Sequence, residues 1–424
     1  MPTGTSTYPL ETWPAAVTPA NAPSGTAWGA YGTRTTAALA GLLTPFTVSL
    51  VGEMPIGEFF LMGVIAYLTI NALLSGRWPG EIFRQRQFWV LCGSQVLAWA
   101  AYIFSDFYRD SSAHDMARGW GRMLFLELDL VAMSYLLVSD RLSFFYYLFA
   151  ELAGEVARAV LVGSLFGDIW KFGIGVPLTY FVIAGACLVG PWTAIAASAG
   201  MGCVSLVLDF RSFGAICFLV AALTGLQQFG RRLRPMLIPL VVLTMIVSYA
   251  FYRQSQANNV HRATRSDVSR SSMLIVTSEA FLHSPLIGQG SWFSNSDVWE
   301  DFLVIRKERA REAHVGGFPE ENEGPGTVAF HSQLLVALAE GGIFGASFFF
   351  TFGFLLVRTL YELCFTRPWE RAGPVFLLLL LSSLCNLFFS PFSGAHRVYI
   401  AASCGLVFLI RKGWDDIDRR RISP

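Results

Sequence analysis

GPVFLLLLLSSLCNLFFSP, residues 373–391, contains no charged side chain. As an α-helix at about 1.5 Å per residue, this stretch would be roughly 28 Å long, close to the ~30 Å thickness of bilayer hydrocarbon. Similar runs recur along the chain, where 54% of the 424 residues are hydrophobic and 14% are charged. A soluble protein carries about a quarter charged residues. The sequence therefore predicts an all-α, polytopic integral membrane protein.

The apolar runs predict about twelve transmembrane helices. The expected spans are residues 35–52, 56–75, 88–105, 122–138, 143–165, 172–190, 191–208, 212–229, 235–252, 333–357, 373–391 and 396–411. The first two spans are separated by a predicted tight turn at Gly52, Pro55 and Gly57. The stretch 172–208 also fits a division with one span fewer.

The short loops between the predicted spans set the orientation. Four of them are rich in arginine and fall on one side of the membrane: GRWPGEIFRQRQ (76–87), RRLRP (231–235), RTLYELCFTRPWERAG (358–373) and the tail RKGWDDIDRRRISP (411–424). Cytoplasmic loops carry an excess of Lys and Arg. We therefore expect this side, and both chain termini, to be cytoplasmic.

The predicted organisation has five parts, two of which are tails. They are a disordered cytoplasmic tail (1–33), transmembrane helices one to nine (34–252), a large outer loop (253–332), helices ten to twelve (333–411) and a cytoplasmic tail (412–424). Within the large loop, NSDVWEDFLVIRKERAREAH (295–314) predicts an amphipathic helix. Its residues Val298, Phe302, Ile305 and Arg309 lie near one helical face.

Three residues that suit chemistry on a phosphorylated lipid are predicted on the outer side: Arg211, Arg270 and His331. A guanidinium donates paired, charge-assisted hydrogen bonds to phosphate, and a histidine can accept a proton near neutral pH. Alternatives remain open from the residues alone. Arg211 could pair with Asp209, and a histidine before a helix could be a structural hydrogen-bonding residue.

Further polar residues are secondary candidates. His396 and Arg397 lie in the last outer loop. Glu340 lies in the tenth predicted span, nine residues after His331, about 13 Å along the helix and on roughly the opposite face. We expect it to be a membrane carboxylate that hydrogen-bonds to a neighbouring span, although an acid in a membrane helix is a functional candidate by default. Gly341, Gly342 and Gly345 would allow close helix approach.

A transporter would use its intramembrane charges differently, as a path for a cation or a proton. The candidate groups for that alternative are Glu127, Asp129, Glu151, Glu155 and Arg158. The composition indicates no cofactor, metal or nucleic acid. The net charge is +1, and the seven cysteines lie in apolar runs with no metal-ligand spacing.

The stretch from residue 200 to 350 resembles the O-antigen ligase and O-antigen polymerase family. The family pattern has an arginine, an apolar helix, Pro-x-x-Gly-x-Gly, and, after a loop, His-Ser or His-Asn followed by Glu-x-Gly. The matching residues are Arg270, Pro285, Gly288, Gly290, His331, Ser332, Glu340, Gly342 and Gly345. DFRSFGAI (209–216) resembles an upstream Ser-Arg element, with Phe210 where serine is common.

The resemblance implies a fold similar to GT-C-like membrane glycosyltransferases and a location in the bacterial inner membrane, with the active site facing the periplasm. It implies transfer of a glycan from undecaprenyl diphosphate to an acceptor hydroxyl, without a metal and with inversion at the anomeric carbon. His331 would be the general base, and Arg211 and Arg270 would hold the diphosphate. We expect a polymerase acting on a glycan acceptor. A ligase acting on a lipid A-core acceptor and a flippase without covalent chemistry are the alternatives.

Overall fold

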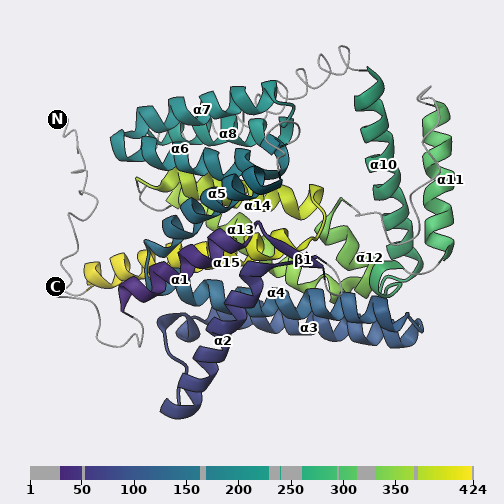
Figure 1. The fold of residues 1–424 in the computed structure, drawn as a ribbon, viewed down its shortest axis with the longest axis horizontal. Coiled ribbons are helices and arrows are strands. Elements are labelled where there is room, and N and C mark those ends of the chain that lie inside the picture. The colour runs from purple at the N-terminus through teal and green to yellow at the C-terminus, as the bar shows by residue number, and fades with distance from the viewer. Residues whose placement is uncertain are drawn as a thin grey trace, which may run out of the picture.

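The computed structural model describes residues 29–49, 53–162, 169–228, 239, 260–293, 296–312, 331–366 and 371–422 of the chain. Their fold is all-α apart from one short β-hairpin, which confirms the predicted fold class. Figure 1 shows the helices stacked as a bundle, with α10 and α11 standing at one end of it. The predicted tail 1–33 and the predicted ninth span, 235–252, lie almost wholly outside the described residues, so the twelve-span count stays a prediction.

Helices account for nearly every described element. In chain order they are α1 (Ala30–Leu43), α2 (Ile56–Ser75), α3 (Arg86–Tyr108), α4 (Ala113–Ser139), α5 (Ser143–Val162), α6 (Gly175–Val189), α7 (Pro191–Val207), α8 (Arg211–Gln228), α10 (Val260–His283), α11 (Ser296–Glu312), α12 (Gln333–Gly345), α13 (Ser347–Tyr361), α14 (Gly373–Phe389) and α15 (Gly394–Ile422). Short 3₁₀ turns cover Glu81–Arg84 and Ser291–Phe293, and π-helical turns cover Trp170–Ile174 and Glu362–Thr366.

The first predicted span, 35–52, is wrong at its C-terminal end. Helix α1 ends at Leu43, and the chain then forms an antiparallel hairpin from β1 (Thr47–Ser49) and β2 (Glu53–Pro55). The proline at position 45 explains this early end, because a proline cannot donate the backbone hydrogen bond that a helix interior needs. The apolar side chains after it therefore continue as strand.

The tenth predicted span, 333–357, is interrupted. Helices α12 and α13 meet at Ala346, and Gly342 inside α12 has a non-helical backbone with φ 66° and ψ −164°. Only glycine adopts this conformation readily, because it has no Cβ. Apolar residues lie on both sides of the break, so hydropathy alone merges them into one span.

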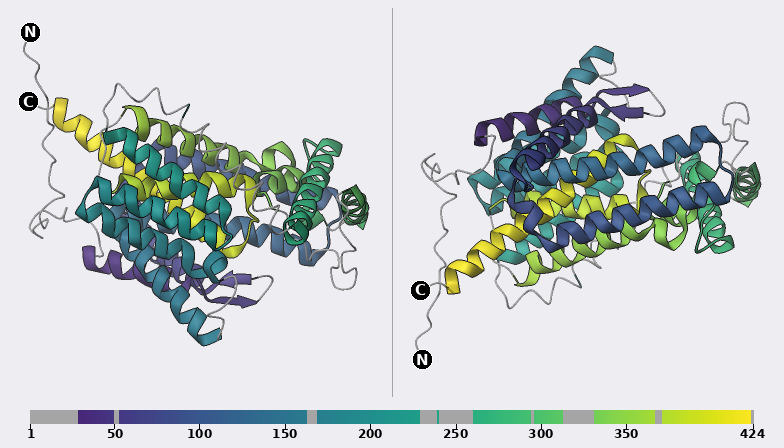
Figure 2. Two further views of the ribbon diagram at one scale, coloured as in Figure 1. Left: turned by 90° about the horizontal axis from the view of Figure 1, so that it is seen from above. Right: turned by 90° about the horizontal axis from the view of Figure 1, so that it is seen from below.

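The large predicted outer loop holds two helices where the sequence predicts one. Helix α11 lies in the stretch expected to be amphipathic, and its Phe302 is fully buried, whereas Arg309 is exposed. The other helix, α10, packs against α11, and both views in Figure 2 place this pair at the end of the bundle away from the C-terminal end of α15.

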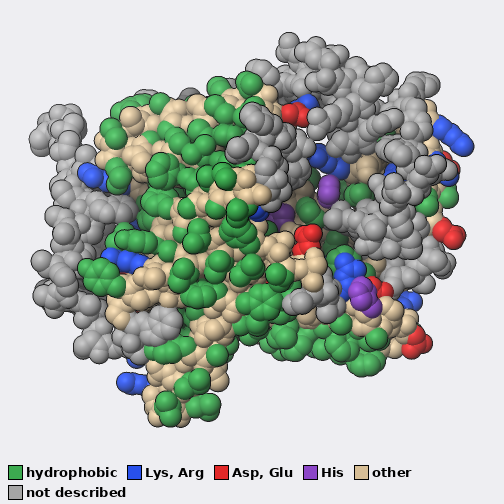
Figure 3. All heavy atoms as spheres, viewed as in Figure 1, with side chains coloured by type: hydrophobic (Ala, Val, Ile, Leu, Met, Phe, Trp, Pro, Cys, Tyr) green, Lys and Arg blue, Asp and Glu red, His purple; other side chains and the backbone are tan. Residues whose placement is uncertain are grey.

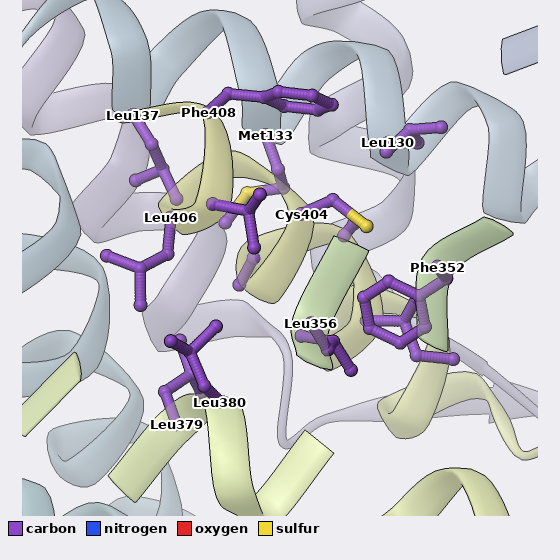
Figure 4. Packing of buried hydrophobic residues seen from close by; sticks show 14 of the residues in the cluster. Leu130, Met133, Leu137, Phe352, Leu356, Leu379, Leu380, Cys404, Leu406 and Phe408 are labelled. Carbon is purple, nitrogen blue, oxygen red and sulfur yellow. The ribbon is translucent and has the colours of Figure 1, made fainter. Parts of the chain in front are cut away.

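A continuous apolar core runs through the bundle. Figure 4 shows part of it, where Leu130 and Met133 of α4 lie near Phe352 and Leu356 of α13 and Cys404 of α15. All five side chains are at most 1% exposed. In a lipid environment this close van der Waals packing holds helices together, since lipid tails are as apolar as the side chains.

The outer surface of the bundle is also apolar. Leu74 of α2, Phe107 of α3 and Val207 of α7 are 84%, 64% and 83% exposed, and Figure 3 shows apolar side chains over much of one face. Large exposed apolar surfaces mark contact with lipid or a partner. Among the described residues, α2, α3 and the stretch Ser347–Phe365 are long and apolar enough to cross a membrane, and four further apolar helices are shorter. These features identify a membrane protein.

Loops that are predicted to share the cytoplasmic side contact one another. Lys412 of α15 forms an ion pair with Glu81 at 2.5 Å and donates to the carbonyl oxygen of Val138 at 3.2 Å. Gln227, at the end of α8, donates to the carbonyl oxygen of Cys364 at 2.5 Å. At the opposite end of α3, Arg109 donates to the carbonyl oxygen of Gly288 in the predicted outer loop at 3.0 Å.

Candidate active site

The Pro-x-x-Gly-x-Gly turn at 285–290 and the Glu-x-Gly part of α12 pair through backbone hydrogen bonds. The amide of Gln289 donates to the carbonyl oxygen of Ala339 at 2.8 Å, and the amide of Ile343 donates to that of Pro285 at 2.9 Å. Gly288 and Gly342 both have positive φ, and a Cβ on either would lie 2.3 or 2.4 Å from a backbone oxygen of the opposite half. Glycine is thus required on both sides of this contact. The glycines thus allow a close backbone contact between the turn at 285–290 and α12, here called the lock.

Glu340 stands at the centre of this lock. Its carbonyl oxygen accepts from the Ser105 hydroxyl at 2.8 Å, and its side chain accepts from the backbone amide of Trp292 at 2.9 Å and from the Arg122 guanidinium. The Glu340 side chain is 2% exposed. It therefore joins α12 to α3, α4 and the segment that follows the turn. A hydrogen bond from a neighbouring helix to this carboxylate is what the sequence led us to expect.

Arg122 of α4 lies among aromatic rings. Its guanidinium carbon is 5.7 Å from the ring centre of Tyr102, 5.2 Å from that of Trp292 and 5.1 Å from that of Phe392. One turn earlier, Arg118 lies 3.8 Å over Trp292. A cation over an aromatic face is stabilised by the ring quadrupole, by about 2 kcal/mol when water is excluded. Phe392 thereby connects this cluster to the segment that holds His396.

Sequence reasoning singled out neither arginine, because Arg118 fell in the loop predicted at 106–121 and Arg122 was only the first residue of the predicted fourth span. The structure begins α4 at Ala113, where the Ser112 hydroxyl accepts from the Asp115 amide at 3.1 Å. Serine before a helix with an acid in its first turn is a helix-start signal. Reading SSAHD (111–115) in this way would have placed Arg118 and Arg122 one turn apart on a helix.

His331 lies directly before α12, and its side chain is half-buried. Ser332, between His331 and α12, caps the helix: its hydroxyl accepts from the Leu335 amide at 3.2 Å. The cap removes one unsatisfied backbone donor and fixes where the helix begins. His331 is thus held by a rigid element on its C-terminal side, within the segment that carries the family pattern.

His396 is near His331 in space, although 65 residues separate them in sequence. The two imidazoles are close enough to interact electrostatically. His396 also hydrogen-bonds through Nδ1 to the Ser393 hydroxyl at 2.7 Å, which fixes its ring orientation. The structure therefore brings together the leading candidate, His331, and the secondary candidate, His396.

Arg397, the other secondary candidate in this segment, is engaged in a buried ion pair. Its Nε and one terminal nitrogen donate to the two carboxylate oxygens of Glu58, both at 2.8 Å. Glu58 is fully buried and Arg397 is 5% exposed. Asp129, also fully buried, lies near enough to interact with both. This arrangement attaches the start of α15 to α2, so Arg397 has a structural role in the described fold.

Arg211 is the first residue of α8 and pairs with Asp209 at 2.7 Å, the alternative that the sequence left open. The Asp209 side chain is 59% exposed, and an ion pair at such a surface contributes only about 0–1 kcal/mol. A ligand phosphate could therefore compete for this guanidinium. Arg270 projects from α10 with an exposed side chain.

The face of the molecule in Figure 3 is hollowed between the main bundle and the α10–α11 pair. Histidine and basic side chains lie in and around this hollow, with an acidic side chain at its edge, whereas apolar side chains cover the bundle beside it. Positive charge in a cleft attracts anionic substrates, because the low-dielectric walls concentrate the field.

The comparison with protein families agrees with the residues that form the lock. Residues 193–350 match the family model described as O-antigen ligase. No curated protein matches the chain. The matched segment contains Arg211, Arg270, His331 and Glu340, and members of this family are glycosyltransferase-like ligases or polymerases. The match bears out the resemblance seen in the sequence, over residues 193–350 of this membrane protein.

Proposed function

We propose that the protein is a glycosyltransferase of the periplasmic face that moves a glycan from undecaprenyl diphosphate to an acceptor hydroxyl, as a polymerase of O-antigen or exopolysaccharide units. The observation that carries this proposal is the position of His331. It lies at the capped start of α12, inside the matched segment, with His396 within electrostatic reach. An imidazole held in this way can accept a proton from a bound hydroxyl.

In the proposed reaction, His331 takes the proton of the acceptor hydroxyl, and the oxygen attacks the anomeric carbon. The bond from that carbon to the diphosphate oxygen breaks, and undecaprenyl diphosphate leaves with the electron pair. Arg211 and Arg270 would hold the diphosphate and stabilise its developing charge. Attack from the face opposite the diphosphate inverts the anomeric centre. Because two guanidinium groups can neutralise the leaving group, the proposal includes no metal.

The direct test is a transfer assay with purified protein and a purified lipid-linked glycan. The proposal predicts longer glycans and free undecaprenyl diphosphate as products. A protein that moves the lipid-linked glycan across vesicle membranes without changing it covalently would instead be a flippase, and that result would contradict the proposal.

Glycan analysis of a deletion strain separates polymerase from ligase. A missing polymerase leaves single repeat units on the cell surface, whereas a missing ligase leaves full-length glycan on the lipid carrier. We expect single repeat units. Full-length glycan attached to undecaprenyl diphosphate would favour the ligase, with lipid A-core as its acceptor.

A further inference from the structure

Gln333, the first residue of α12, has a buried side-chain amide without hydrogen-bond partners among the described residues. It is 1% exposed, and within the described part of the chain neither its amide oxygen nor its amide nitrogen has a hydrogen-bond partner. Nearly all buried polar groups in proteins are hydrogen-bonded, because loss of water is otherwise uncompensated. A buried amide with two unused hydrogen-bonding atoms indicates a partner that the described residues do not supply.

Gln333 lies two residues after His331 in the chain. Ser332, between them, is extended, with φ −159° and ψ 115°, and its hydroxyl caps α12. In an extended segment, alternate side chains point to the same side. This backbone therefore favours a common side for His331 and Gln333.

The face of α12 that carries Gln333 also carries Glu340. These two residues are seven apart, which is close to two full helical turns, and the helix is regular up to Gly342. At the Glu340 end of this face lies Arg122, whose Nε is also buried without a hydrogen-bond partner among the described residues. Arg122 contacts Phe392, in the segment whose His396 lies near His331. Buried groups without a hydrogen-bond partner among the described residues therefore lie at both ends of this face of α12: the Gln333 amide at the end near His331, and Arg122 Nε at the Glu340 end.

We propose that Gln333 binds a sugar of the acceptor glycan and so positions the hydroxyl that His331 activates; this inference rests on the proposed glycosyl transfer. The chemistry fits a neutral sugar. An amide offers one acceptor oxygen and two donor hydrogens in a plane, which matches neighbouring hydroxyls that each donate and accept. An anionic group such as the diphosphate would be served by a guanidinium, which only donates.

The test replaces Gln333 by methionine, which has a similar length and flexibility but no hydrogen-bonding amide. Transfer is measured with labelled lipid-linked donor while the concentration of acceptor repeat unit is varied, and thermal stability is measured in parallel. We expect kcat/KM for the acceptor to fall roughly tenfold to a hundredfold through a raised KM, because two hydrogen bonds to the sugar are lost. The melting temperature should stay equal or rise, since an unpaired buried amide has been removed.

Gln95 on α3 provides the matched control. It is also fully buried and its amide oxygen likewise has no partner among the described residues, but its side-chain nitrogen donates to the carbonyl oxygen of Met123 at 2.8 Å. Gln95→Met should therefore lower the melting temperature and leave kcat/KM per folded protein unchanged. The opposite responses of two buried glutamines distinguish a substrate contact from a structural one.

Wild-type kcat/KM in Gln333→Met would overturn the inference, whatever its melting temperature. If this variant does not fold, Gln333→Leu takes its place, and loss of folded protein in both would identify Gln333 as a structural residue and also overturn the inference. A wild-type protein that transfers no glycan would contradict the proposed function itself, a result that is distinct from an active enzyme insensitive to position 333.

Discussion

Substitution of a single side chain, Arg270, tests whether a diphosphate is held by paired hydrogen bonds. Its guanidinium is exposed on α10, so substitution should leave the fold intact. Lysine keeps the charge but cannot reproduce the two parallel donors of a guanidinium. We therefore predict that Arg270→Lys is nearly as inactive as Arg270→Ala in the transfer assay. Full activity in the lysine variant would mean that a general positive charge suffices or that Arg270 takes no part.

The buried pair of Arg122 and Glu340 predicts a strong dependence of stability on both partners. Removing one member leaves the other as an uncompensated buried charge, which costs about 3–5 kcal/mol. Glu340→Gln keeps an acceptor oxygen for the Trp292 amide, so its loss of stability would report on the lost charge. We expect each single variant, Glu340→Gln and Arg122→Met, to have a lower melting temperature than the wild type, as measured by thermal unfolding in detergent.

Combining these two substitutions supplies the control for that prediction. The double variant removes both charges, and replacement of a whole buried ion pair is often neutral. It should therefore regain much of the stability that each single variant loses. Additive losses in the double variant would show that the two side chains do not act as a pair.

At the level of elements, the lock between the turn at 285–290 and α12 depends on Gly342. A Cβ at this position would lie 2.4 Å from the carbonyl oxygen of Leu286, and φ is 66°. Gly342→Ala should therefore destabilise the protein by about 1–3 kcal/mol or more. Gly93→Ala on α3 is the matched control, since a Cβ there meets nothing within 4 Å. If both variants unfold at the wild-type temperature, the lock does not contribute to stability.

Most of the helices could be predicted from the sequence, because a helix that crosses a membrane needs an apolar run of about its own length. The sequence did not predict the break at Gly342, because apolar residues lie on both sides of Glu340–Gly342 and hydropathy merges them into one span. It also missed the start of α4, where polar residues before the apolar run suggested a loop although the cap at Ser112 begins a helix. The approach of His396 to within electrostatic reach of His331 depends on tertiary packing across 65 residues, which no local pattern reveals.

At the level of the whole molecule, the predicted orientation has a direct test. In a variant without its native cysteines, single cysteines at Val260, Glu320 and Asp415 are labelled with a membrane-impermeant reagent in intact cells with a permeable outer membrane. The arginine-rich loops predict labelling at positions 260 and 320 and protection at 415. Labelling at 415 from outside would reverse the topology and place the His331 side in the cytoplasm.

The central claim is that His331 acts on the substrate, and His331→Ala tests it most directly. A general base contributes about 10²–10⁴-fold to a rate, and a half-buried residue at the edge of a helix contributes little to core packing. Transfer from a purified lipid-linked glycan should therefore fall by about that factor while the melting temperature is kept. His283→Ala, at the exposed end of α10, is the matched control and should retain full activity. A stable His331→Ala protein with wild-type turnover would contradict the claim.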